Sequence, residues 1–174
     1  MELTTAGPDD AAWLAPLAAR WFRAAFVDAN DPDDVDAYVA AAFHPDQFTA
    51  ELADPRTTTL LARDVDASPR QVLGYAMLVA GAGPNVVGER PVELRRLYVE
   101  TALTGRGLGG ALLELALARC AAAGHDVAWL GVWEHAVRAI GFYTAHGFRR
   151  VGSQPFTLGS RLQTDLVLAR VVAP

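Results

Sequence analysis

The fold is decided by residues 92–118, VELRRLYVETALTGRGLGGALLELALA. Its first part predicts a β-strand without glycine or proline, with apolar residues at Val92, Leu94, Leu97 and Val99. The alternation slips at Arg95-Arg96, which predicts a bulge, because one extra residue restores the apolar face. A polar turn and a glycine-rich segment follow. An apolar helix then begins near Leu108, with apolar residues at helical spacing up to Ala118.

The glycine-rich segment Gly105–Gly110 joins this strand to this helix. The first turn of a helix has N–H groups without partners and carries partial positive charge, and glycines let a phosphate approach them. A pyrophosphate site and a tight turn without a ligand are equally good interpretations of this segment alone. The spacing of Gly105, Gly107 and Gly110 matches the dinucleotide pattern GxGxxG, but the acidic residue at the end of a second strand is missing.

Composition limits the classes of function. The chain has 174 residues, is 52% hydrophobic and has a net charge of −5, which disfavours nucleic acid as a partner. Its one cysteine, Cys120, excludes an intrachain disulfide and a cysteine-based metal site, and we expect no metal. Residues 1–10 do not resemble a signal peptide and no segment could cross a membrane, so we expect a cytoplasmic protein with no membrane partner.

The rest of the chain predicts one domain over 1–174, of α+β (mixed α/β) class, with a central, mostly antiparallel sheet and helices on both faces. The expected strands are 2–5, 57–62, 71–80, 126–133, one beginning at 149, and 163–172. The expected helices are 13–26, 33–43, 46–53 and 134–146, and residues 64–70 are expected to form a polar turn.

Two N-terminal features have a structural and a functional interpretation. The aromatic residues Trp21, Phe22 and Phe26 lie on the apolar side of a predicted helix, where they form core or line an acceptor pocket. The acidic run 28–36 is a solvated turn, favourable beside a helix N-terminus, or an acidic lip that attracts a cationic amine.

Two motifs resemble the GCN5-related N-acetyltransferase (GNAT) family. Leu97-Tyr98-Val99 followed by Thr104–Gly109 is similar to the family's motif A, whose turn binds the pyrophosphate of acetyl-CoA. The ordered pattern Ala139-Ile140-x-Phe142-Tyr143 with Gly147-Phe148 is the more specific of the two. The likeness spans about residues 58–168 and implies the family's acyltransferase fold, with a twisted sheet of about six or seven strands.

The resemblance implies roles for particular residues. Tyr143 would donate a proton to the leaving thiolate, and Glu93 is the best candidate for the base, or else an ion-pair partner of an arginine. The Val99 N–H would polarise the thioester carbonyl, and Leu97–Val99 would pair with the pantetheine arm. The implied acetyl-CoA contacts are Leu97, Tyr98, Val99, Thr104, Gly105, Arg106, Gly107, Leu108, Gly109, Gly110, Ala136 and Tyr143.

Three residues depart from the family's pattern. Thr104 replaces Gln or Arg, Ala136 replaces an asparagine that contacts the cofactor, and Arg95 replaces a frequent glutamate.

Short matches, including 163–166, resemble the bacterial spermine/spermidine branch, which implies transfer of an acetyl group to a primary amine of a small molecule, a polyamine first. The alternatives are an acyl-CoA-binding sensor without catalysis and a protein N-terminal or lysine acetyltransferase. The resemblance is compatible with a homodimer.

Overall fold

The computed structural model describes residues 1–66 and 71–172, so part of the expected turn at 64–70 lies outside the described residues. One seven-stranded sheet has the order β1-β2-β3-β4-β5-β7-β6. Its strands are β1 (Glu2–Ala6), β2 (Thr57–Arg63), β3 (Val72–Ala80), β4 (Pro91–Val99), β5 (Val127–Trp133), β6 (Arg149–Leu158) and β7 (Arg161–Val171). Only β4 and β5 pair in parallel, which confirms the expected α+β fold with a mostly antiparallel sheet.

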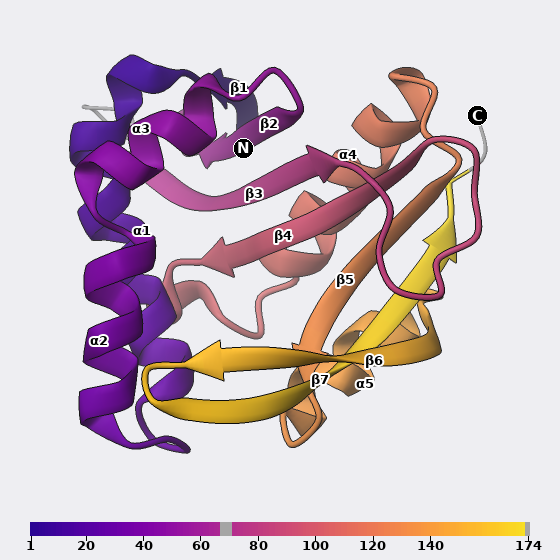
Figure 1. Cartoon of the computed structure of the whole chain (residues 1–174). Helices are drawn as coiled ribbons and strands as arrows, with labels where there is room; N and C mark the ends of the chain where they lie inside the picture. The colour runs from indigo at the N-terminus through magenta and orange to yellow at the C-terminus, as the bar shows by residue number, and fades with distance from the viewer. Residues whose placement is uncertain (67–70, 173–174) are drawn as a thin grey trace.

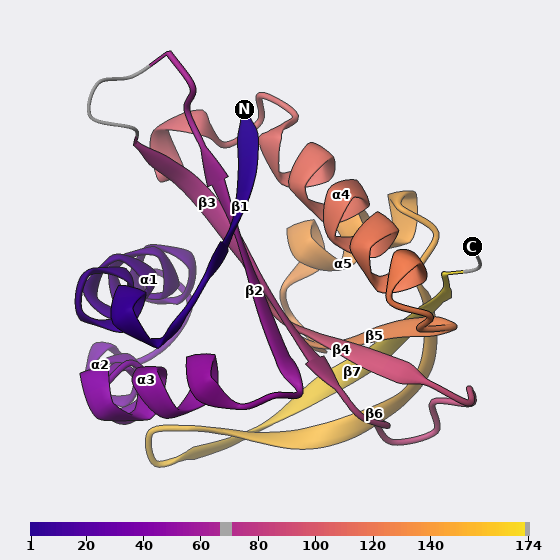
Figure 2. The same ribbon diagram turned by 90° about the horizontal axis from the view of Figure 1, so that it is seen from above.

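Helices cover both faces of the sheet, as the sequence predicts (Figures 1 and 2). One face carries α1 (Ala11–Phe26), α2 (Pro32–Ala42) and α3 (Pro45–Ala53), and the other carries α4 (Leu108–Ala122) and α5 (Val137–Ala145). Short 3-10 turns, η1 (Pro8–Asp10) and η2 (Thr101–Leu103), precede α1 and follow β4. None of the helices described is long and apolar enough to cross a membrane.

The predicted bulge in β4 is confirmed. Met77 of β3 pairs with Arg96, whereas its neighbour Leu78 pairs with Leu94, so Arg95 is the extra residue. Leu94 before the bulge and Leu97 after it both pack on the α4 side of the sheet. The bulge therefore restores the apolar face, as the slip in alternation indicates.

The ladder between β4 and β5 is short. It contains only the pairs Pro91–Val127, Val92–Ala128 and Glu93–Trp129, and beyond them the strands diverge (Figure 1). On its other side β4 stays paired with β3 up to Val99. One edge of β4 after Glu93 is therefore open.

The sequence prediction places the start of α5 too early. We expect a helix from residue 134, but it begins at Val137. Ala136 has φ −79° and ψ 62°, which is not helical, and its N–H donates to the Trp133 carbonyl in a turn that leads out of β5. Helical spacing alone does not reveal such a turn, because Ala136 still lies on the side of the helix that faces the sheet.

Candidate functional site

The open edge of β4 presents backbone donors toward β5. The Glu100 N–H donates to the Leu73 carbonyl of β3 at 2.7 Å. Because N–H directions alternate along a strand, the N–H groups of Leu97 and Val99 point the other way, to the open edge. Leu97 and Val99 are only partly buried. This edge can accept an extended chain as an added strand.

The turn after β4 presents further donors at the N-terminus of α4. Gly105 has φ +82° and Gly107, the N-cap, has φ +80°, a conformation that other residues adopt only at a cost. A Cβ atom at either glycine would meet open space. Within the described chain no acceptor receives a hydrogen bond from the N–H groups of the five residues Gly105, Gly107, Leu108, Gly109 and Gly110. Free amides at a helix N-terminus bind phosphate.

The remaining turn residues differ in what they can add. The side chains of Thr104 and Arg106 are exposed, and Arg106 has no ion-pair partner among the described residues, so it is free to meet a phosphate. At Gly110 a Cβ atom would lie 2.9 Å from Nε2 of His146, so this glycine lets α4 and α5 approach each other. Ala136 is partly buried beside the same helices and offers no polar side chain.

Tyr143 lies on α5, against the aliphatic core. Its ring packs edge-on against Phe148 at 5.7 Å between centroids. Burial raises the pKa of the Tyr143 phenol above its usual 10, and burial is also the main cause of the raised pKa of Tyr98 on β4. Tyr98 packs on the core under α1–α3, whereas Tyr143 packs on the core under α4 and α5. A phenol with a raised pKa is protonated at neutral pH and can donate a proton.

Glu93 lies at the last pair between β4 and β5 and holds an ion pair. Its Oε2 atom accepts hydrogen bonds from Arg95 at 2.8 Å (Nη2) and 3.1 Å (Nε). The side chain of Glu93 is 19% exposed. The structural alternative that the sequence leaves open for Glu93, an arginine partner, is therefore present, and Arg95 balances the nearest acidic charge instead of pointing freely at an acceptor.

The second arginine of the bulge is buried, which sequence reasoning missed. Arg96 is 7% exposed and pairs with Glu51 of α3 through both guanidinium nitrogens Nη1 and Nη2. The guanidinium also lies 4.9 Å from the ring centroid of Phe43 and 5.4 Å from that of Phe48. The partner is 45 residues away in sequence, so no local pattern indicates the pair.

The N-terminal helices use most of their aromatic and acidic residues internally. Trp21 and Phe22 are 2% and 4% exposed, so they are core, and Phe26 stacks on Phe22 at 4.4 Å. Within the acidic run, Asp31 caps α2, Asp34 accepts hydrogen bonds from Ser160 and Asp36 pairs with Arg23. Backbone and side-chain hydrogen bonds from Ser160 lower the pKa of Asp34.

Another carboxylate that sequence reasoning did not single out lies on β7. Asp165 is 8% exposed, and no described residue forms a hydrogen bond or ion pair with it. Burial raises its pKa from 3.8 to about 6. An aspartate in an otherwise apolar strand segment, before Leu166-Val167-Leu168, is the signal that could have found it.

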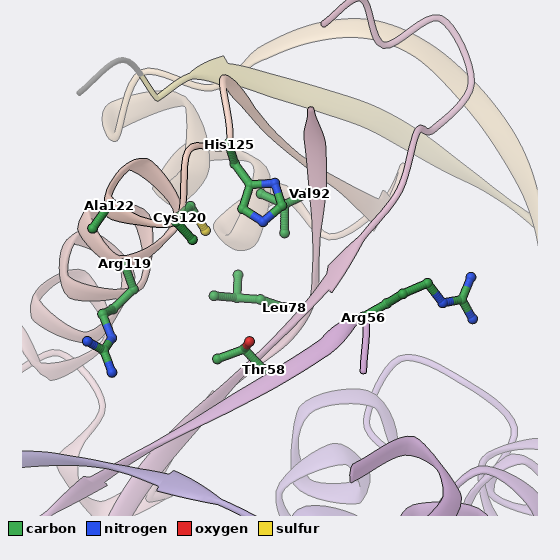
Figure 3. Close-up of a pocket in the computed structure, with 9 residues that line it drawn as sticks. Arg56, Thr58, Leu78, Val92, Arg119, Cys120, Ala122 and His125 are labelled. Carbon is green, nitrogen blue, oxygen red and sulfur yellow. The ribbon is translucent and has the colours of Figure 1, made fainter. Parts of the chain in front are cut away.

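Two cavities lie away from these residues. One, of about 320 Å³, lies between the C-terminal part of α4 and strands β2–β4 (Figure 3), and its lining includes Cys120, whose thiol pKa burial raises to about 11. The other, of about 440 Å³, lies between α1 and the β3 end near Glu100. A buried thiol with a raised pKa is unreactive, as expected for a structural cysteine. In residues 1–66 and 71–172 no cluster of His, Cys, Asp and Glu is arranged to hold a metal.

Comparison with known proteins agrees with this geometry. The model of the acetyltransferase (GNAT) family matches residues 17–148. An uncharacterized N-acetyltransferase of Mycobacterium tuberculosis is 36% identical over 161 residues, covering 92% of this chain and 97% of that protein. An uncharacterized N-acetyltransferase of Lactobacillus delbrueckii subsp. lactis is 32% identical over 157 residues, covering 90% and 88%.

Solved structures share the fold at low sequence identity. The PaiA N-acetyltransferase from Thermoplasma acidophilum, in complex with coenzyme A, superposes with a TM-score of 0.74 at 17% identity, covering 98% of both chains. Because the family model matches most of this chain, the chain belongs to the acetyltransferase (GNAT) family.

Proposed function

We propose that this enzyme transfers the acetyl group of acetyl-CoA to a primary amine of a small molecule, with a polyamine as the first candidate, by direct attack in a ternary complex. The observation that carries the proposal is the pair of free donor sets, at the α4 N-terminus and along the open edge of β4. The turn after β4 joins the two donor sets, and Tyr143 lies on α5, which approaches the start of α4 where Gly110 meets His146.

Different parts of acetyl-CoA are bound by different residues. Amides from Gly105 to Gly110 and the Arg106 side chain hold the diphosphate, and Leu97–Val99 pair with the pantetheine arm as an added strand. The Val99 N–H polarises the thioester carbonyl as charge develops on its oxygen. Thr104 and Ala136 flank the same ligand without a charged or amide side chain.

Two side chains move protons. An alkylamine with a pKa of roughly 10 is about 0.1% neutral at pH 7, so a base must take one proton, and Glu93 is proposed for that step. For Glu93 to accept a proton, the guanidinium of Arg95 must shift off its Oε2 atom. Tyr143 gives its proton to the departing thiolate, and the proton that the nitrogen loses after attack restores the phenol.

Thiol release from acetyl-CoA in the presence of an amine tests the function. We expect turnover with spermidine, 1,4-diaminobutane or n-butylamine and a fall of at least tenfold in kcat for Tyr143→Phe. Tyr75→Phe is the matched control, because Tyr75 is fully buried in the core on the opposite face. Coenzyme A binding without release of thiol for any amine or peptide would favour the sensor function, and activity on peptides alone would favour protein acetylation.

A further inference from the structure

The inference concerns Asp165 of β7, a buried carboxylate for which the chain supplies no partner. Its neighbours along the strand, Leu166 and Leu168, pack with the aliphatic core on the α4 side. Because side chains alternate along a strand, Asp165 points to the opposite face, which α1, α2 and α3 cover. This is the face on which Glu93 and Arg96 also lie, opposite the buried Val92 and Leu94.

Access to the Asp165 carboxylate is provided by a glycine on the neighbouring strand. Gly131 of β5 is exposed, and a Cβ atom there would lie 3.0 Å from Oδ2 of Asp165 and 2.8 Å from Nε2 of Gln154 on β6. Any larger residue at Gly131 would fill the space beside the carboxylate. The glycine therefore keeps one side of a buried acid open, on the stretch of β5 that has already parted from β4.

Three other carboxylates on this side of the sheet already have a cationic or hydrogen-bonding partner within the described chain. Glu93 pairs with Arg95, Glu51 pairs with Arg96, and Asp34 accepts hydrogen bonds from Ser160. Asp165 has none, and a carboxylate that is largely removed from water is stabilised when a cation meets it. The residues that face it, Gly131 and Trp133 of β5 and Gln154 of β6, carry no charge.

We propose that Asp165 binds the ammonium group of a diamine or polyamine that is not the one acetylated, and so makes the enzyme selective for acceptors with a second cationic amine. The proposal rests on the proposed acetyltransferase function and adds the residue that determines the charge of the acceptor. The ammonium nitrogen enters beside Gly131 and forms an ion pair with the carboxylate on the face of the sheet above the paired strands β5 and β7. The raised pKa of Asp165, about 6, means that the carboxylate is ionised and able to bind a cation at the pH of the cell.

The test is a kinetic comparison of Asp165→Asn with wild type, using thiol release with n-butylamine, 1,4-diaminobutane and spermidine. We expect KM for 1,4-diaminobutane and spermidine to rise at least tenfold in Asp165→Asn, while KM for n-butylamine, whose only nitrogen is the one that attacks, stays within twofold. We expect kcat to stay within threefold and the affinity for coenzyme A, measured by calorimetry, to be unchanged. In wild type KM falls as pH rises through about 6, when the carboxylate becomes ionised, and this dependence is lost in Asp165→Asn. Glu93→Gln should show the reverse split, a lower kcat at similar KM.

Asp46→Asn is the matched control, because it makes the same charge change on Asp46 of α3, whose side chain is 95% exposed. Both kinetic constants should stay within twofold of wild type. If wild type acetylates amines but KM for the diamine and for spermidine in Asp165→Asn stays within twofold, the role of Asp165 is wrong and the acetyltransferase function stands. If wild type releases no thiol with any amine, the function itself fails and the role of Asp165 with it. A melting temperature of Asp165→Asn lowered by 5 °C or more at pH 8 would indicate a structural role and overturn the proposal.

Discussion

The two faces of the sheet are covered by cores of different side-chain composition. Under α4 and α5 the core consists mostly of aliphatic side chains, with leucine, alanine and valine around Leu112 and Leu130. Under α1–α3 it is aromatic, with stacked rings such as Trp21–Tyr75 and Tyr75–Tyr98, and it contains the buried pair Arg96–Glu51. The aliphatic face positions the N-terminus of α4. The aromatic face holds the charged side chains that we propose an acceptor meets.

This difference means that one face depends on packing and the other on paired charges. A core of aliphatic side chains tolerates volume-conserving changes. A buried ion pair is sensitive to loss of either partner, because the remaining charge has no water to solvate it. Four substitutions or conditions sharpen the contrast, in order of decreasing effect.

The largest effect is expected for Glu51→Ala on the aromatic face. This substitution leaves Arg96, 7% exposed, without its carboxylate, and the free energy of unfolding should fall by about 3–5 kcal/mol. Urea unfolding measures it. The control is Glu114→Ala, which breaks the more exposed pair with Arg170 and should cost about 0–1 kcal/mol. Equal losses in the two variants would contradict the contrast.

The next effect is the pH dependence that Asp165 imposes. Its pKa is raised from 3.8 to about 6 in the folded chain, so between these values the folded state holds a proton that the unfolded state has released. This contribution therefore lowers stability as pH rises from about 4 to about 6, by up to about 3 kcal/mol. The difference in unfolding free energy between wild type and Asp165→Asn, measured across this range, isolates it. A difference that does not change with pH would show that the carboxylate is not buried in solution.

A smaller effect is expected at the turn before α4. Gly107→Ala places a side chain at φ +80° and should cost about 1–2 kcal/mol of stability. Gly109→Ala is the control, since Gly109 is helical and a Cβ atom there lies 3.9 Å from Phe142. This control should gain up to about 1 kcal/mol from helix propensity. Thermal unfolding without ligand compares the two, and a loss at Gly109 as large as at Gly107 would contradict the left-handed turn.

The smallest effect is expected for Tyr75→Phe. The Tyr75 hydroxyl is buried without a hydrogen-bond partner in the described chain, so its removal should leave stability unchanged or raise it by about 1 kcal/mol. Urea unfolding of the variant gives the value. Destabilisation by more than 1 kcal/mol would mean that a buried water or a rearranged partner satisfies this hydroxyl in solution.

The sequence predicts the cofactor side better than the acceptor side, for a physical reason. The bulge at Arg95, the glycine turn and the start of α4 follow from residues adjacent in the chain, and each has a local signature. The charges of the acceptor side depend on long-range register. Nothing in the adjacent pair Arg95-Arg96 says which arginine turns inward, and the space beside the Asp165 carboxylate depends on a glycine 34 positions away.

The same reasoning explains the late start of α5. Helical spacing is present from Ala136 onward, but the chain first needs a turn after β5, and a turn of two or three residues leaves that spacing intact. The role of Tyr143 stays a prediction, whereas its surroundings are now described: a phenol against Phe148, with a pKa above its usual value.

The three-pair ladder between β4 and β5 has a consequence for mechanics. It leaves strands β1–β4 and β5–β7 joined in the sheet by a narrow seam, so a molecule that bonds to the β4 edge would bridge the seam. A bound substrate would then complete the sheet, and the loaded enzyme should be stiffer than the empty one at the seam, where we propose that acyl transfer occurs.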